Sequence, residues 1–96
     1  MDLTLQIDTN YSLQEASEVI RSALEHEKYL AKYKIDRYSM ICDKFEDQYD
    51  LISTEFMKKF EAGELIDDGK YLDWYAAKRG LDHWKKKLAL LKSIRI

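Results

Sequence analysis

The residues best suited to nucleophilic or acid–base chemistry in this sequence are Cys42, His26 and His83. A catalytic thiol needs a histidine within hydrogen-bond reach, and a further group usually orients that histidine. Cys42 instead follows Ile41 in a stretch with helical periodicity, and no motif links it to either histidine. We interpret Cys42 as a small buried thiol that packs like an apolar residue, and we predict neither enzymatic activity nor a cofactor.

The positions of the two histidines do not favour metal binding. His26 precedes Glu27, and His83 follows Asp82. Adjacent residues of a helix point about 100° apart, so neither pair chelates one ion well. The sequence therefore predicts no metal site at the histidines.

Three acids, Glu64, Asp67 and Asp68, lie within five positions and could indicate a calcium-binding loop. The run lacks the alternating ligand positions and the terminal glutamate of an EF-hand loop. Helix capping explains it more simply, because Asp67 and Asp68 come just before the expected final helix. We predict that one of these two aspartates caps that helix.

Basic residues gather at the end of the chain. Between residues 78 and 96, Asp82 is the only acid. The basic residues of this stretch are Lys78, Arg79, Lys85, Lys86, Lys87, Lys92 and Arg95. Lys78, Lys85 and Lys92 recur every seven residues, which places them in one row along a helix. The row fits a solvated or internally paired helix face, contact with an acidic protein surface, or phosphate binding. The net charge of −2 and the lack of a DNA-binding motif weigh against the last use.

Aromatic residues cluster at the start of the final helix, where Tyr71, Trp74 and Tyr75 lie within five positions. One interpretation is a core between the last two helices. The other is an anchor for a protein partner, because tryptophan, tyrosine and arginine dominate interface energetics. The sequence leaves both interpretations open.

The elements that must position these residues are helices. The chain has 96 residues, no proline and three glycines, a composition that suits a few long helices in one small domain better than a β-sandwich or barrel. Its apolar runs are too short to cross a membrane. Residues 1–10 contain no signal-like block, and Cys42 is the only cysteine, so we expect a cytoplasmic protein.

The first helix is expected over residues 12–49. Ser12 and Glu15 match a capping box, and neither glycine nor proline interrupts the following apolar stripe. Glu27 falls where the stripe expects an apolar residue, and such polar positions often fix the register of paired helices. Before this helix, Leu3, Leu5 and Ile7 alternate with polar residues, which fits either a short strand paired in a dimer or an irregular N-terminus.

Two further helices are expected over residues 53–62 and 70–93. Ser53 is the predicted N-cap of the short helix, and Gly63 follows its end as the C′ residue. The final helix carries apolar residues with the 3–4 spacing typical of a coiled coil. This seam consists of Trp74, Ala77, Leu81, Trp84, Leu88 and Leu91. Gly80 inside the helix costs about 1 kcal/mol relative to alanine, so we predict a close helix approach there.

Residues 60–65 (FEAGEL), 67–68 (DD) and 71–81 (YLDWYAAKRGL), followed by Trp84, resemble a family of small helical proteins from archaea and cyanobacteria. Members are often encoded beside TumE-type toxins and are interpreted as their antitoxins. The resemblance covers residues 38–92 and is strongest over 60–84. The family commonly has a glycine before the paired aspartates, where this sequence has Ile66. The resemblance implies a toxin as partner and no catalytic residues.

We therefore expect an all-α fold, in which a long helical hairpin holds a short connecting helix and the seam packs mainly on the chain's own first helix. The first helix is too long for the last one to cover, which predicts a symmetric homodimer. The expected function is a protein-binding module that neutralises a toxin encoded beside it, and the alternative is a nucleic-acid-associated protein. The predicted contacts are Tyr71, Trp74, Tyr75, Lys78, Arg79, Lys85 and Lys92.

Overall fold

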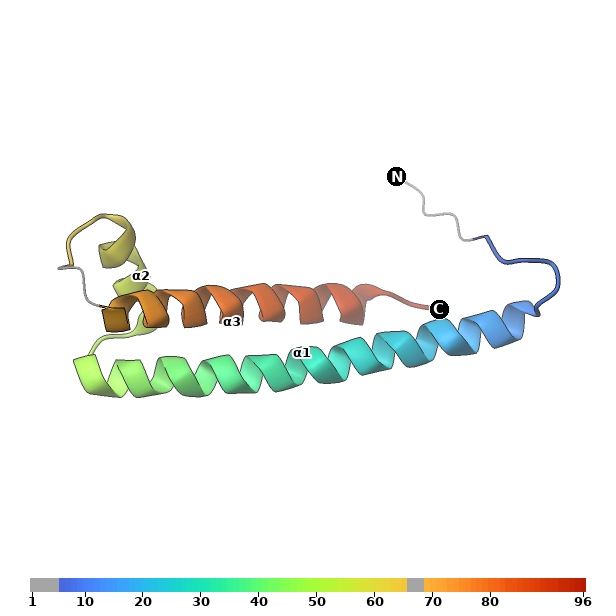
Figure 1. Ribbon diagram of the computed structural model, residues 1–96, viewed down its shortest axis with the longest axis horizontal. Helices are drawn as coiled ribbons and strands as arrows, with labels where there is room; N and C mark the ends of the chain where they lie inside the picture. Colours follow the sequence, from blue (N-terminus) through green and yellow to red (C-terminus); the bar gives the residue numbers. More distant parts are fainter. Residues whose placement is uncertain (1–5, 66–68) are drawn as a thin grey trace.

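The computed structural model describes residues 6–65 and 69–96, and these form three helices. They are α1 (Leu13–Tyr49), α2 (Ser53–Glu61) and α3 (Gly69–Ser93). Helix α3 runs back along α1, and α2 lies at the turn between them (Figure 1). The molecule is a rod of 61 × 26 × 20 Å. The predicted all-α hairpin with a short connecting helix is thus confirmed, and the helix bounds differ from the predicted ones by one residue at most.

No strand is present within residues 6–65 and 69–96. Ile7 lies in irregular backbone, and Leu3 and Leu5, which carry most of the predicted strand, are outside the described residues. None of the helices in the described part of the chain is long and apolar enough to cross a membrane.

Helix α1 begins and ends by local capping. The Ser12 hydroxyl accepts a hydrogen bond from the backbone N–H of Glu15 at 3.0 Å, as predicted for its N-cap. Asp50 ends the helix in the left-handed conformation, with φ of 50°. The helix is continuous over 37 residues.

The start of α2 differs from the prediction by one residue. Ile52 occupies the N-cap position and Ser53 is the first helical residue. The Ser53 hydroxyl accepts a hydrogen bond from the indole Nε1–H of Trp74 at 2.9 Å, so it does not cap the helix. The Glu46 carboxylate takes over that role and accepts the Ser53 backbone N–H at 2.7 Å. At the other end, Gly63 has φ of 72° after the C-cap residue Ala62, as predicted.

The core lies where the three helices meet on Trp74. Its ring stacks on Phe56 of α2, with 3.8 Å between centroids and 6° between planes. Phe45 and Tyr49 of α1 stack against it at 5.5 and 5.7 Å. Trp74 and Phe56 are completely buried. The aromatic cluster therefore joins one residue from α2, two from α1 and one from α3 into a single packed unit.

From this cluster the seam continues along α1 and α3. Ala77, Leu81 and Leu91 of α3 are buried, together with Ala31 of α1. The seam is therefore packed within the chain, as expected, and its apolar residues are covered largely by α1.

Two further contacts join α1 and α3 along the seam. A Cβ atom added to Gly80 would meet the ring of Tyr38 at 2.8 Å, so the glycine makes room for this ring. About two turns further on, Lys87 forms an ion pair with Glu27 at 3.2 Å. The close approach predicted at Gly80 is confirmed by the first contact, and a register-fixing role for Glu27 stays a prediction.

Candidate protein-binding surface

Three of the predicted contact residues, Tyr71, Tyr75 and Arg79, lie on α3 beside α2 and are at least partly exposed. We call Phe60, Tyr71, Tyr75 and Arg79 the α2–α3 surface. The ring of Tyr75 stacks on Phe60 at 4.7 Å between centroids. Arg79 lies one turn further along α3, with its guanidinium carbon 5.7 Å from the centre of the Tyr75 ring. The arginine donates a hydrogen bond to the Tyr75 hydroxyl at 3.1 Å.

This arrangement holds an exposed cation in a defined position. The hydrogen bond to Tyr75 raises the pKa of Arg79 further above its ordinary value, so the group stays charged. Arg79 forms no ion pair within residues 6–65 and 69–96. A guanidinium held this way keeps N–H groups available for a carboxylate, which arginine can bind with two parallel hydrogen bonds.

Trp74 does not belong to this surface, which corrects the prediction that it contacts a partner. Its side chain has no exposed area, and Ser53 accepts its only N–H donor. The helical spacing placed Trp74 on the same turn as Tyr71 and Tyr75, but α2 covers it. Trp74 is therefore a core residue, whereas Tyr75 is partly exposed and remains a candidate contact residue.

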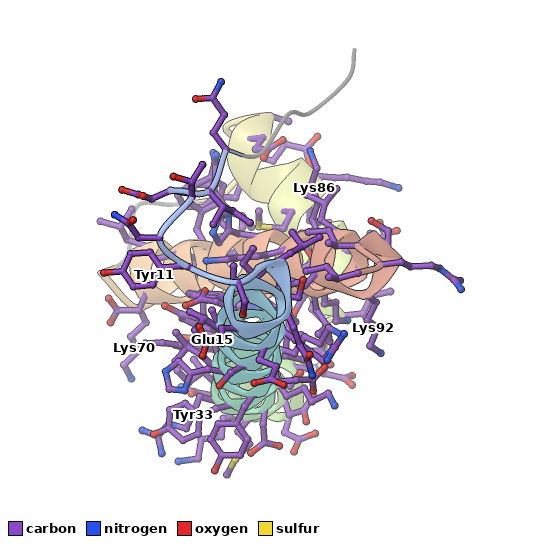
Figure 2. The ribbon with its side chains drawn as sticks, turned by 90° about the vertical axis from the view of Figure 1, so that its right-hand side faces the viewer. Tyr11, Glu15, Tyr33, Lys70, Lys86 and Lys92 are labelled. Carbon is purple, nitrogen blue, oxygen red and sulfur yellow. The ribbon has the colours of Figure 1, made fainter. Side chains whose placement is uncertain are left out.

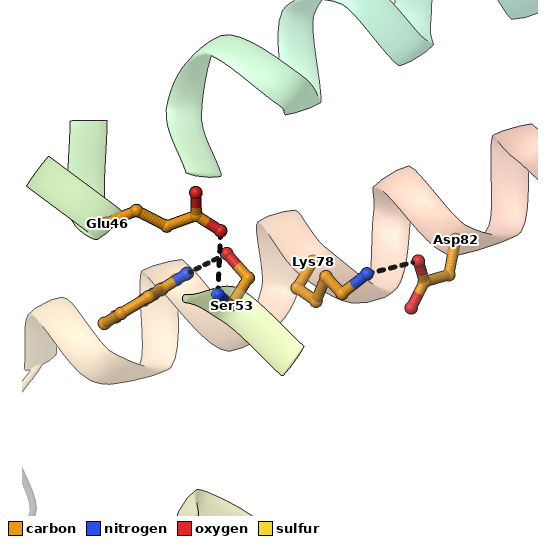
Figure 3. A network of polar contacts seen from close by, with 5 residues as sticks. Glu46, Ser53, Lys78 and Asp82 are labelled. Carbon is orange, nitrogen blue, oxygen red and sulfur yellow. Dashed lines mark hydrogen bonds and ion pairs between the residues drawn. The ribbon is translucent and has the colours of Figure 1, made fainter. Parts of the chain in front are cut away.

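The side chain of Lys78 is also mostly buried, so this residue is not part of the α2–α3 surface. Its ammonium group pairs with Asp82 at 2.7 Å and its side chain is only 17% exposed (Figure 3). Lys85 and Lys92 of the same row are exposed, and Figure 2 shows Lys92 extending to the side of the rod. The row is therefore partly neutralised inside the protein and partly free to meet a partner.

The polar groups of Glu46, Ser53 and Trp74 at the α1–α2 junction form hydrogen bonds with one another. Figure 3 shows the Glu46 carboxylate pointing to Ser53, whose hydroxyl also accepts the hydrogen bond from the Trp74 indole. Cys42 lies in the same region and is buried. Burial raises the pKa of the Cys42 thiol above its ordinary value, and a hydrogen bond with Ser53 opposes this shift. The thiol is neutral near pH 7 and packs in the core, as the sequence predicted.

The histidines and acids form no metal site in the described part of the chain, where no group of three or more His, Cys, Asp or Glu side chains is placed to hold an ion. Asp67 and Asp68, the predicted caps of the last helix, fall outside the described residues.

A second surface lies where α1 extends beyond α3. Helix α1 has 37 residues and α3 has 25, a difference that corresponds to roughly 18 Å of helix. Figure 1 shows this uncovered end beside the C-terminus of α3. Leu13 and Val19 are 72% and 69% exposed there. A hollow of about 480 Å³ lies at this end, lined by Ile7, Tyr11, Glu15, Ala16, Val19 and Ile20.

A third surface is the face of α1 that points away from α3, which carries Tyr29, Tyr33 and Met40. This face is not among the contact surfaces predicted from the sequence. The signal is present, because these residues are separated by four and seven positions and so share one side of a helix. Only the packing shows that α3 covers the opposite side.

Comparison of the chain with protein-family models, with curated proteins and with solved structures found no match.

Proposed function

We propose that this chain is a protein-binding module that neutralises a toxin by docking on it and covering its active surface. The observation that carries the proposal is the α2–α3 surface, where Arg79 is held on the Tyr75 ring and forms no ion pair among the described residues. Preorganised aromatic and arginine side chains are the residues that contribute most to protein interfaces. The resemblance to proteins encoded beside TumE-type toxins supplies the class of partner.

The chemistry of this surface favours an acidic partner. Lys85 and Lys92 are exposed further along the same helix, about 120° and 140° around it from Arg79, and add to its positive charge. Charge of one sign speeds encounter with an oppositely charged protein and sets its orientation. We place this interaction in the cytoplasm, where a lone thiol such as Cys42 stays reduced.

Self-association is part of the proposal. Two copies related by a two-fold axis can place their uncovered α1 ends side by side and antiparallel, so that each end occupies the position that α3 leaves empty on the other copy. Leu13 and Val19 would then be buried between copies. The support for a second copy at this position is that Leu13 and Val19 are exposed beside an apolar hollow at the uncovered end of α1.

The proposal is tested by co-expressing the tagged chain with the product of the neighbouring gene and measuring complex formation. We expect co-purification, and we expect Arg79→Glu with Lys85→Glu to weaken the complex about tenfold or more, as charge reversal at an interface does. The matched control is Arg21→Glu with Lys32→Glu, which makes the same charge change on α1 and should leave the affinity unchanged.

Two results contradict the proposal. One is the absence of a complex with the neighbouring product when both proteins are folded. The other is retention of the native chain on duplex DNA or RNA at low salt, lost at high salt and in the Arg79→Glu, Lys85→Glu variant but not in the control, which would favour the nucleic-acid alternative.

A further inference from the structure

The face of α1 that points away from α3 exposes apolar side chains near the middle of the rod. Tyr33 and Met40 are 53% and 54% exposed, and Ile41 beside them is 38% exposed. Figure 2 shows Tyr33 pointing away from α3. The core of the monomer already contains Ala31, Cys42 and Phe45 of this helix, so the exposed residues are not needed to complete it.

Two shallow hollows surround these side chains. One holds about 270 Å³ and is lined by Tyr33, Lys34, Arg37, Tyr38 and Ile41. The other holds about 120 Å³ and is lined by Arg37, Met40, Ile41 and Lys44. Arg37 and Ile41 belong to both, so the hollows form one continuous surface. We call Tyr33, Lys34, Arg37, Met40, Ile41 and Lys44 the outer α1 surface.

The charge of the outer α1 surface is entirely positive. Within residues 6–65 and 69–96, neither Lys34, Arg37 nor Lys44 takes part in an ion pair. The nearby acids Asp36 and Asp43 directly precede Arg37 and Lys44 in sequence. Neither aspartate lines the hollows. Asp36 lies three positions after Tyr33 and four before Met40, so it borders these apolar side chains on the side away from Arg37. The flank of α1 that carries the hollows thus combines three cations with apolar side chains.

We propose that the outer α1 surface binds an amphipathic segment of a partner protein that carries Asp or Glu beside apolar side chains. Apolar side chains of such a segment cover Tyr33, Met40 and Ile41, and its carboxylates meet the three cations. This is the pattern by which an amphipathic helix lies in an apolar groove, with charge complementarity fixing its orientation. A nucleic acid fits less well, because phosphates leave the apolar centre exposed. The proposal rests on the protein-binding function above but not on the α2–α3 surface.

The test measures binding of a fluorescent synthetic helical peptide with leucine on one face and glutamate along its edges. A peptide with glutamine in place of glutamate and a single-stranded DNA serve as comparison probes. We expect the native chain to bind the glutamate peptide, and to bind it more weakly as salt rises. Arg37→Glu with Lys44→Glu should reduce the affinity about tenfold or more, and Tyr33→Ser with Met40→Ser should also reduce it. Arg21→Glu with Lys32→Glu, on the same helix and with the same charge change, should not.

Circular dichroism of each variant confirms that it is folded. The inference is overturned if the glutamate and glutamine peptides bind with equal affinity. It is also overturned if the control variant loses as much peptide affinity as the variants of the outer α1 surface. DNA binding that Arg37→Glu with Lys44→Glu abolishes would overturn it as well. It is also overturned when Arg79→Glu with Lys85→Glu lowers the affinity for the glutamate peptide while Arg37→Glu with Lys44→Glu leaves it unchanged. In that last case the peptide binds the α2–α3 surface, and the proposed function stands without a second site.

Discussion

At the scale of single residues, Ser53 connects all three helices. It belongs to α2, its hydroxyl accepts a hydrogen bond from the indole N–H of Trp74 in α3, and its backbone N–H donates one to the Glu46 carboxylate of α1. Trp74 is completely buried, so its donor has no access to water if the hydroxyl is removed. A buried polar group that loses its partner costs about 1–3 kcal/mol.

Replacing Ser53 with alanine is therefore expected to lower the free energy of unfolding by about 1–3 kcal/mol. In a Trp74→Phe background the same change should cost much less, because the ring no longer carries the N–H donor. Urea unfolding followed by circular dichroism of the four proteins gives the coupling between the two residues. A coupling close to zero would show that the hydrogen bond contributes nothing to stability.

At the scale of the helices, α1 and α3 pair through a contact between a large and a small residue. The Tyr38 ring fills the space that Gly80 leaves, and Glu27 and Lys87 pair elsewhere on the same two helices. A glycine inside a helix costs about 1 kcal/mol relative to alanine. The tight packing of the tyrosine ring is the compensating gain.

Gly80→Ala is expected to destabilise the native chain by about 1 kcal/mol, because displacing a packed ring costs more than the gain in helix propensity. In a Tyr38→Ala background the ring is gone, so Gly80→Ala should stabilise by about 1 kcal/mol. Thermal and urea unfolding of both pairs measure the change of sign. If Gly80→Ala stabilises both backgrounds equally, the ring moves aside freely and the contact does not set the register.

At the scale of the whole molecule, the unequal lengths of α1 and α3 leave one end of the hairpin uncovered. The other end is closed by α2 and by the aromatic cluster around Trp74 (Figure 1). The uncovered end exposes Leu13 and Val19 beside a hollow lined mainly by apolar side chains. Contiguous exposed apolar surface of this kind is typical of an interface.

Sedimentation equilibrium is expected to show a dimer whose population rises with protein concentration. Leu13→Ser with Val19→Ser should shift the equilibrium to the monomer, because these side chains lose the apolar area that a second copy buries. Leu72→Ser with Leu90→Ser is the matched control, since both leucines are exposed on α3, and it should leave the dimer intact. A native chain that stays monomeric at every concentration would contradict the proposed self-association.

The sequence by itself determined the elements and where most of them begin and end. Ser12 starts α1 through a hydrogen bond to a near neighbour, and Gly63 follows the end of α2 with a positive φ. Both roles depend only on nearby residues, so the local sequence pattern predicts them. The same holds for the seam of α3, because a 3–4 spacing of apolar residues makes one helix face whatever it packs on. The short α2 and the hairpin follow from these signals.

The tertiary structure decided which side chains of each helix are available. Trp74 and Tyr75 are neighbours in sequence, yet one is buried under α2 and the other is only half-buried. Ser53 is a good N-cap by its chemistry, but it bonds to a residue 21 positions away. Lys78, in the row with Lys85 and Lys92, is neutralised by Asp82. Burial and pairing depend on which faces meet, and that is settled by the packing of all three helices together rather than by any local pattern.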